Sequence, residues 1–235
     1  MERWNENGWR ARHAWLCFAA VYGLSMAVAF NLYVFSVKWP SVLDISSPQA
    51  AFFVTICGLL IAFSVTLAFA KVSSLGAFSR VFRLNRPPTP FGIWGLLFGL
   101  GIALAAMYLI RHGYTPDTVL SRSFRSAGSG VSVLLSVAGL VSPFFEEPMM
   151  RGFLYPAFRG SYRAVTSTMI VIAMGLLLHP DALSKPGVYT LLIISLNLAL
   201  CLLRENSISL WDCIICHLAY NGTLALTDIW RMVGQ

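Results

Sequence analysis

The sequence has very little charge. Of its 235 residues, 11% are Asp, Glu, Lys or Arg and 57% are hydrophobic, whereas an ordinary soluble domain contains about 25% charged residues. The apolar runs are also too long and too frequent for a soluble core. The shortage of charge therefore excludes a soluble domain and favours one integral-membrane unit over residues 1–235.

The sequence also lacks a cysteine pattern that would indicate a disulfide framework. Its five cysteines all fall in or beside apolar runs, which is typical of buried free thiols: Cys17, Cys57, Cys201, Cys213 and Cys216. The stretch "CIICH" at 213–217 matches the C-x-x-C-H pattern of c-type haem attachment. Its apolar flanks continue a membrane span, so no haem is expected there.

No cleavable signal peptide is indicated at the N-terminus. The first apolar run, near 13–37, is much longer than the roughly 7 to 15 residues of a signal-peptide core, and no convincing small-residue cleavage site follows it. It is therefore expected to remain as a transmembrane anchor.

Long apolar windows are what the sequence has in abundance, and a transmembrane helix needs about 17 to 25 such residues. We expect an all-α polytopic bundle with a polar intramembrane site and about seven spans, near 13–37, 49–70, 91–110, 129–159, 164–179, 187–203 and 207–229. Leu75, Phe78 and Phe82 have helical spacing between arginines. This connection is either a short interfacial helix or a solvated basic loop.

The net charge of +7 comes from basic residues that flank the apolar runs. This placement suits the headgroups of a lipid bilayer and argues against a nucleic-acid partner. The distribution favours a multi-pass protein of the cell membrane with a cytoplasmic N-terminus. Arg111, Arg122 and Arg125 oppose that orientation, because they would lie outside.

Ionisable residues inside the apolar helices mark the candidate site, since such residues are costly in a bilayer. Glu146 lies about 21 Å along its helix from the turn at Gly160, and His179 lies about 25 Å from the same turn on the next helix. His217 lies about 17 Å from the turn at Glu205. Three helices therefore deliver polar groups to a similar depth, which predicts a shared intramembrane site.

The two adjacent glutamates are expected to have different roles. Glu147 and Arg151 are four residues apart with the glutamate first, the better orientation for an ion pair, whereas Glu146 has no such neighbour. Glu147 and Arg151 are therefore expected to be structural, and Glu146 to accept a proton. Pro143 and Pro148 each free a backbone carbonyl and bend the helix, which makes room for water beside Glu146.

Three other interpretations remain open at this point. The glutamates and Arg151 also suit a purely structural polar cluster, and His179, which precedes a proline, also suits an ordinary helix end. His179, His217 and a glutamate make a plausible zinc set, although the usual H-E-x-x-H spacing is absent. His217 and Asn221 lie one helical turn apart and aim two donors at one point.

The motifs resemble those of the CAAX-protease and bacteriocin-processing (CPBP) intramembrane peptidases, which include the type II CAAX prenyl endopeptidases. The resemblance covers roughly 130–225, the expected catalytic core, and rests on "EEPMMRG", "RGFLYP" and on "HLAYN" behind "LRENSISLW". A phenylalanine is usual four residues before the middle histidine, but Gly175 stands there before His179.

The resemblance implies a glutamate peptidase with no metal or other cofactor. Glu146 and His179 would activate a water, while His217 and Asn221 would stabilise the oxyanion. The expected substrate is a membrane-associated peptide or protein, with or without a C-terminal lipid. The alternatives are a catalytically silent scaffold or immunity-type protein of the same fold and, last, a proton-coupled transporter that uses Glu146.

Overall fold

All regular elements in the described part of the chain are helices. The computed structural model describes Trp4, 8–39, 47–72, 74–112, Tyr114, 129–179, 182–183 and 187–233. The elements are α1 (Ala11–Lys38), α2 (Pro48–Phe69), α3 (Leu75–Val81), α4 (Phe91–Arg111), α6 (Ser129–Val141), α7 (Pro143–Glu147), the π-helix η2 (Pro148–Leu154), α8 (Tyr155–Arg159), α9 (Ala164–Leu177), α11 (Val188–Asn206) and α12 (Trp211–Val233). The expected all-α class is confirmed.

In the described part of the chain, four helices are long and apolar enough to cross a membrane: α1, α2 from Phe52, α4 and α11. They support a membrane protein, but the expected count of about seven spans is not confirmed. Helix α9 has only 14 residues. The segment expected over 129–159 is divided into α6, α7, η2 and α8.

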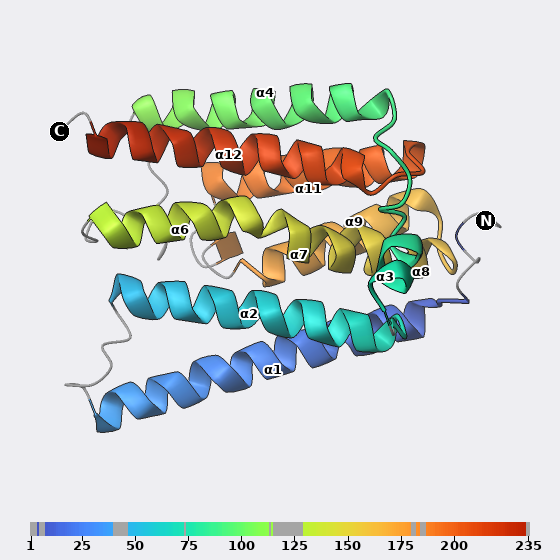
Figure 1. Cartoon of the computed structure of the whole chain (residues 1–235), viewed down its shortest axis with the longest axis horizontal. Helices are drawn as coiled ribbons and strands as arrows, with labels where there is room; N and C mark the ends of the chain where they lie inside the picture. The colour runs from blue at the N-terminus through green and yellow to red at the C-terminus, as the bar shows by residue number, and fades with distance from the viewer. Residues whose placement is uncertain are drawn as a thin grey trace.

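The long helices run side by side along the molecule (Figure 1). In this view α1 and α2 form one side, α4 and α12 form the opposite side, and α6 and α7 lie between them. Helix α12 packs against α4, α6, α7 and α11, and α2 packs against α1, α6, α7 and η2. Helix α7 is therefore held between α2 and α12.

Helices α4 and α12 pack unusually closely because α4 presents small residues to α12. The buried residues of α4 are all Gly or Ala: Gly92, Gly95, Gly99, Ala103 and Ala106. A Cβ atom on Gly99 would lie 2.2 Å from the backbone oxygen of Cys216, and one on Gly95 would lie 2.7 Å from that of Asp212. Only glycine permits this backbone approach, a common device for joining membrane helices.

The connection after α2 contains a helix, α3, rather than only a loop. It begins where the Ser74 hydroxyl accepts a hydrogen bond from the Ala77 backbone N–H. Phe82, just after α3, is fully buried. A Cβ atom on Gly152 of η2 would lie 2.6 Å from the Phe82 ring, so the glycine lets this ring pack against the π-helix.

Candidate active site

The site lies on a helical segment that is interrupted by three prolines, Pro143, Pro148 and Pro156. Each proline removes one backbone N–H and leaves a carbonyl without its usual partner. The segment adopts the π form over Pro148–Leu154, and π-helical turns often occur at functional sites. Two of the free carbonyls accept hydrogen bonds from side chains of other helices.

Asn221 of α12 satisfies the carbonyl that Pro143 leaves free. In an unbroken helix the N–H of residue 143 would bond to the Gly139 oxygen, but proline has none. The Asn221 amide nitrogen donates to that oxygen at 2.8 Å, and to the Ser142 hydroxyl at 3.3 Å. Asn221 therefore stabilises the bend just before Glu146.

Arg204 of α11 satisfies a second free carbonyl, that of Arg151. Within η2 the Tyr155 N–H bonds to the Met150 oxygen, five residues back. The next bond of this type would need an N–H at Pro156, so the Arg151 oxygen lacks a helical partner. The Arg204 Nε atom donates to it at 2.9 Å, and its side chain is buried.

Glu147 and Arg151 form the ion pair that their spacing predicts. The Arg151 Nη1 atom lies 3.2 Å from Glu147 Oε1, and both side chains are buried. Arg151 Nη2 donates to the Asn197 side-chain oxygen at 2.6 Å and to its backbone oxygen at 3.3 Å. Glu147 Oε2 and Arg151 Nε have no hydrogen-bond partner among the described residues.

His217 lies between the two glutamates. Its Nδ1 atom is 2.8 Å from Glu147 Oε1, and its Nε2 atom is 4.0 Å from Glu146 Oε2. A carboxylate paired with arginine only accepts hydrogen bonds, so Nδ1 must carry the proton. The Nε2 atom that faces Glu146 is then an acceptor in neutral histidine and a donor in the imidazolium.

The exposures of the two carboxylates differ sharply. The Glu146 side chain is 28% exposed, whereas that of Glu147 is fully buried. Adjacent residues on one helix thus present one carboxylate to the outside and one to the protein interior. Glu146 is the carboxylate of the pair that a substrate or a water molecule can reach.

His179 lies just beyond α9, where its Nδ1 atom is 2.8 Å from the backbone oxygen of Gly175. Because a carbonyl only accepts, Nδ1 carries the proton and Nε2 is left as an acceptor in neutral histidine. Among the described residues, no hydrogen bond joins His179 to Glu146 or His217. The structure therefore brings together Glu146, Glu147, Arg151 and His217, but does not join His179 to them.

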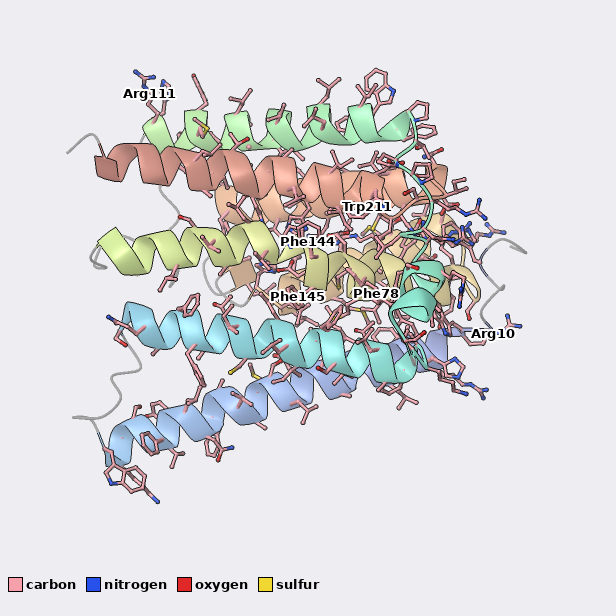
Figure 2. All side chains as sticks on the ribbon, in the orientation of Figure 1. Arg10, Phe78, Arg111, Phe144, Phe145 and Trp211 are labelled. Atoms are coloured by element: carbon pink, nitrogen blue, oxygen red, sulfur yellow. The ribbon has the colours of Figure 1, made fainter. Side chains whose placement is uncertain are left out.

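Aromatic side chains flank Glu146 on both sides of α7. Figure 2 shows Phe144 on the side of α12 and Phe145 on the side of α2. The Phe144 ring lies 6.4 Å from that of Trp211. The Phe145 ring lies 5.1 Å from that of Phe63, which in turn contacts Phe78 at 5.6 Å. These contacts hold α7 between its neighbours, while Phe144 remains 41% exposed.

Two residues with a direct part in the site are not among those that the sequence predicts for it. Asn197 is a buried amide in the apolar helix α11, and Arg204 belongs to the "LRENSISLW" stretch of the family resemblance. A polar residue in an apolar helix is a usable signal. Their partners on η2 could not be inferred, because they depend on the π-helix and on helix packing.

Metal-binding geometry is the remaining question for the zinc alternative. Among the described residues, no three histidine, cysteine, aspartate or glutamate side chains are grouped so that they could hold a metal ion. The pair formed by Glu146 and His217 offers two potential ligands.

One comparison with known proteins finds a family model that matches part of the chain. Residues 128–223 match the model for the type II CAAX prenyl endopeptidase Rce1-like family, which agrees with the resemblance to CPBP peptidases. The match includes Glu146, His179, His217 and Asn221. Neither the search of curated proteins nor that of solved structures finds a match.

Proposed function

We propose that this chain, whose residues 128–223 belong to the Rce1-like protease family, hydrolyses a peptide bond of a membrane-associated substrate with Glu146 as general base. The proposal rests chiefly on one observation: Glu146 is 28% exposed beside the Nε2 atom of His217, while its neighbour Glu147 is buried in an ion pair. Such a division leaves one carboxylate available for proton transfer.

In this mechanism a water molecule is the nucleophile. The 4.0 Å between Glu146 Oε2 and His217 Nε2 is too long for a direct hydrogen bond, and gaps of this kind are often bridged by water. Glu146 takes a proton from the water as its oxygen attacks the carbonyl carbon, and later gives it to the leaving amine. We propose that His179, through its free Nε2 atom, helps to orient this water in the substrate complex.

His217 then stabilises the oxyanion as an imidazolium. Its Nδ1 proton is held by Glu147, so Nε2 becomes a donor to the developing charge only when it takes over the proton that Glu146 has removed from the water. This proton returns to Glu146 before Glu146 gives it to the leaving amine. Buried Glu147 supports that cation, and donors of this kind typically contribute about 3 to 4 kcal/mol to the transition state. Glu147 thus has an electrostatic role besides its pairing with Arg151.

Asn221 is the second proposed oxyanion donor, but its amide is already engaged. Both hydrogens have acceptors, Gly139 O at 2.8 Å and Ser142 Oγ at 3.3 Å. The longer bond to Ser142 is the one that would be released on substrate binding. Asn221 would then keep the bend of the helix while it contacts the substrate.

The substrate class is a peptide or protein at the membrane, and we include C-terminally prenylated substrates because of the family name. The direct test is to incubate the purified protein in lipid nanodiscs with a farnesylated C-terminal peptide, its unmodified form and an apolar transmembrane peptide. We expect cleavage of at least one by the native protein and none by Glu146→Gln. Cleavage of none by the native protein, or equal cleavage by both proteins, would refute the proposed function.

A further inference from the structure

We propose that Asn197 is a positioning residue that orients His217 through Arg151 and Glu147, and that Gly175 is required because it leaves space for the Asn197 side chain. This inference rests on the proposed function for its catalytic consequence. Its structural part, the orientation of His217, can be measured without any substrate.

A continuous chain of contacts leads from Asn197 to the site. The Asn197 oxygen accepts a 2.6 Å hydrogen bond from Arg151 Nη2, and Arg151 Nη1 lies 3.2 Å from Glu147 Oε1. The same Glu147 oxygen lies 2.8 Å from His217 Nδ1. All four side chains are buried.

Asn197 is itself firmly placed. Its amide nitrogen donates to the Ile193 backbone oxygen, one turn earlier in α11, at 2.9 Å. This bond fixes which way the amide faces, so its oxygen points to Arg151. Among the residues that the structure describes, Arg151 Nε already has no hydrogen-bond partner. Without the Asn197 side-chain oxygen, Arg151 Nη2 would keep only its longer 3.3 Å bond to the backbone oxygen of residue 197. The buried guanidinium would then be short of another acceptor and less firmly held against Glu147.

Gly175 leaves the space that the Asn197 side chain occupies. A Cβ atom at position 175 would lie 2.8 Å from the Asn197 Oδ1 atom and 3.2 Å from its Cγ and Nδ2 atoms. Any side chain there would push the amide out of its place. This gives a physical reason for the glycine that stands where the family motif usually has phenylalanine: in this chain the space beside α9 is filled by Asn197 from α11.

The same glycine also connects to His179, because its backbone oxygen accepts from His179 Nδ1. Gly175 thus contacts the side chains of Asn197 and His179 at once. The proposal concerns only the Asn197 contact, since a substitution at 175 leaves the backbone oxygen in place.

The experiment compares Asn197→Ala with a matched control on the same helix, Asn206→Ala. Asn206 also donates to a carbonyl one turn earlier, Leu202 O at 2.8 Å, but it is exposed, and none of the described hydrogen bonds joins it to Arg151. We expect Asn197→Ala to lower kcat about 10- to 100-fold with KM nearly unchanged, as for a small misplacement of a catalytic group. Asn206→Ala should leave kcat unchanged. Equal kcat values for the two variants would overturn the proposal.

A spectroscopic measurement separates this role from general destabilisation. The chain has four histidines, so ¹⁵N-histidine spectra in detergent can be assigned with a His217→Gln variant. We expect the native His217 to show a protonated Nδ1, and Asn197→Ala to shift this signal toward a mixture of tautomers at temperatures where the variant is still folded. An unchanged His217 signal in the folded variant would overturn the proposal. This result does not depend on whether the protein cleaves peptides.

Gly175→Ala approaches the same contact from the other side, and it also serves if Asn197→Ala does not fold. Alone, it should reproduce part of the His217 shift and part of the kcat loss. In the Asn197→Ala background it should add little, because the side chain it displaces is gone. If the two losses of kcat instead multiply, Gly175 and Asn197 act independently, and the proposed packing of Asn197 against Gly175 has no effect on the site. If Gly175→Ala alone leaves both His217 and kcat unchanged, this role of the packing is likewise refuted.

Discussion

Glu146 and Glu147 are neighbours in the chain, yet their surroundings have little in common. Glu147 is fully buried and its Oε1 atom contacts both Arg151 and His217, whereas Glu146 is 28% exposed and faces the Nε2 atom of His217 at 4.0 Å. The difference arises because successive helical residues point about 100° apart, one toward α11 and α12 and one away from Arg151. Two identical side chains can therefore serve structure and chemistry separately.

The largest expected effect comes from removing the exposed carboxylate. Glu146→Gln keeps the shape of the side chain but cannot accept the proton of a water molecule, so kcat should fall by about 10²- to 10⁴-fold. The melting temperature in detergent should stay near that of the native protein, because Glu146 makes no close ion pair. A folded Glu146→Gln variant with near-native kcat would show that the two glutamates are not divided in this way.

The next largest effect is expected from breaking the buried ion pair between Glu147 and Arg151. Arg151→Met leaves the Glu147 carboxylate unpaired in the interior, and such orphan charges typically cost about 3 to 5 kcal/mol of unfolding free energy. Combining it with Glu147→Gln removes the orphan charge, so much of the loss should be recovered. The measurement is a double-mutant cycle of thermal stability. Simple addition of the two single losses would mean that the pair is not coupled.

A smaller loss is expected at Arg204. Arg204→Met removes the donor to the Arg151 backbone oxygen, and a buried carbonyl without a partner costs about 1 to 3 kcal/mol. The exposed Arg12→Met serves as the control for loss of one positive charge. A stability loss in Arg204→Met no larger than in the control would show that the π-helix does not need this donor.

The smallest effect is expected from metal removal. If Glu146 and His217 act on water without zinc, exhaustive chelation should leave kcat unchanged within error. Inactivation by the chelator, with recovery on adding one equivalent of Zn²⁺ per chain, would favour the metal interpretation.

Local patterns predicted a good part of this structure. The four-residue spacing of Glu147 and Arg151 predicted their contact, and the apolar windows located the helices even where the span count is not confirmed. The helix breaks were expected from Pro143 and Pro148. Which side chain satisfies each free carbonyl was not predictable, because Asn221 is 82 residues from Gly139 and meets it only through packing.

The contact between His217 and Glu147 escaped prediction for the same reason. The two residues are 70 positions apart in the sequence. The position of a residue along its own helix does not show which face of that helix packs against another helix. From helix lengths we expected His179 to lie at the same membrane depth as Glu146 and His217. In the described part of the structure its side chain bonds to the backbone oxygen of Gly175 instead. Its place in the chemistry stays a prediction that depends on the substrate complex.

The glycine face of α4 has a consequence for how the protein is made. Its partner α12 begins about 100 residues after α4 ends, so at 5–20 residues per second the ribosome needs roughly 5 to 20 s to supply it. During that time α4 would reside in the bilayer with its narrow Gly and Ala surface uncovered. We therefore expect newly made α4 to be the part of the nascent chain most readily captured by other small-residue helices or by insertion factors.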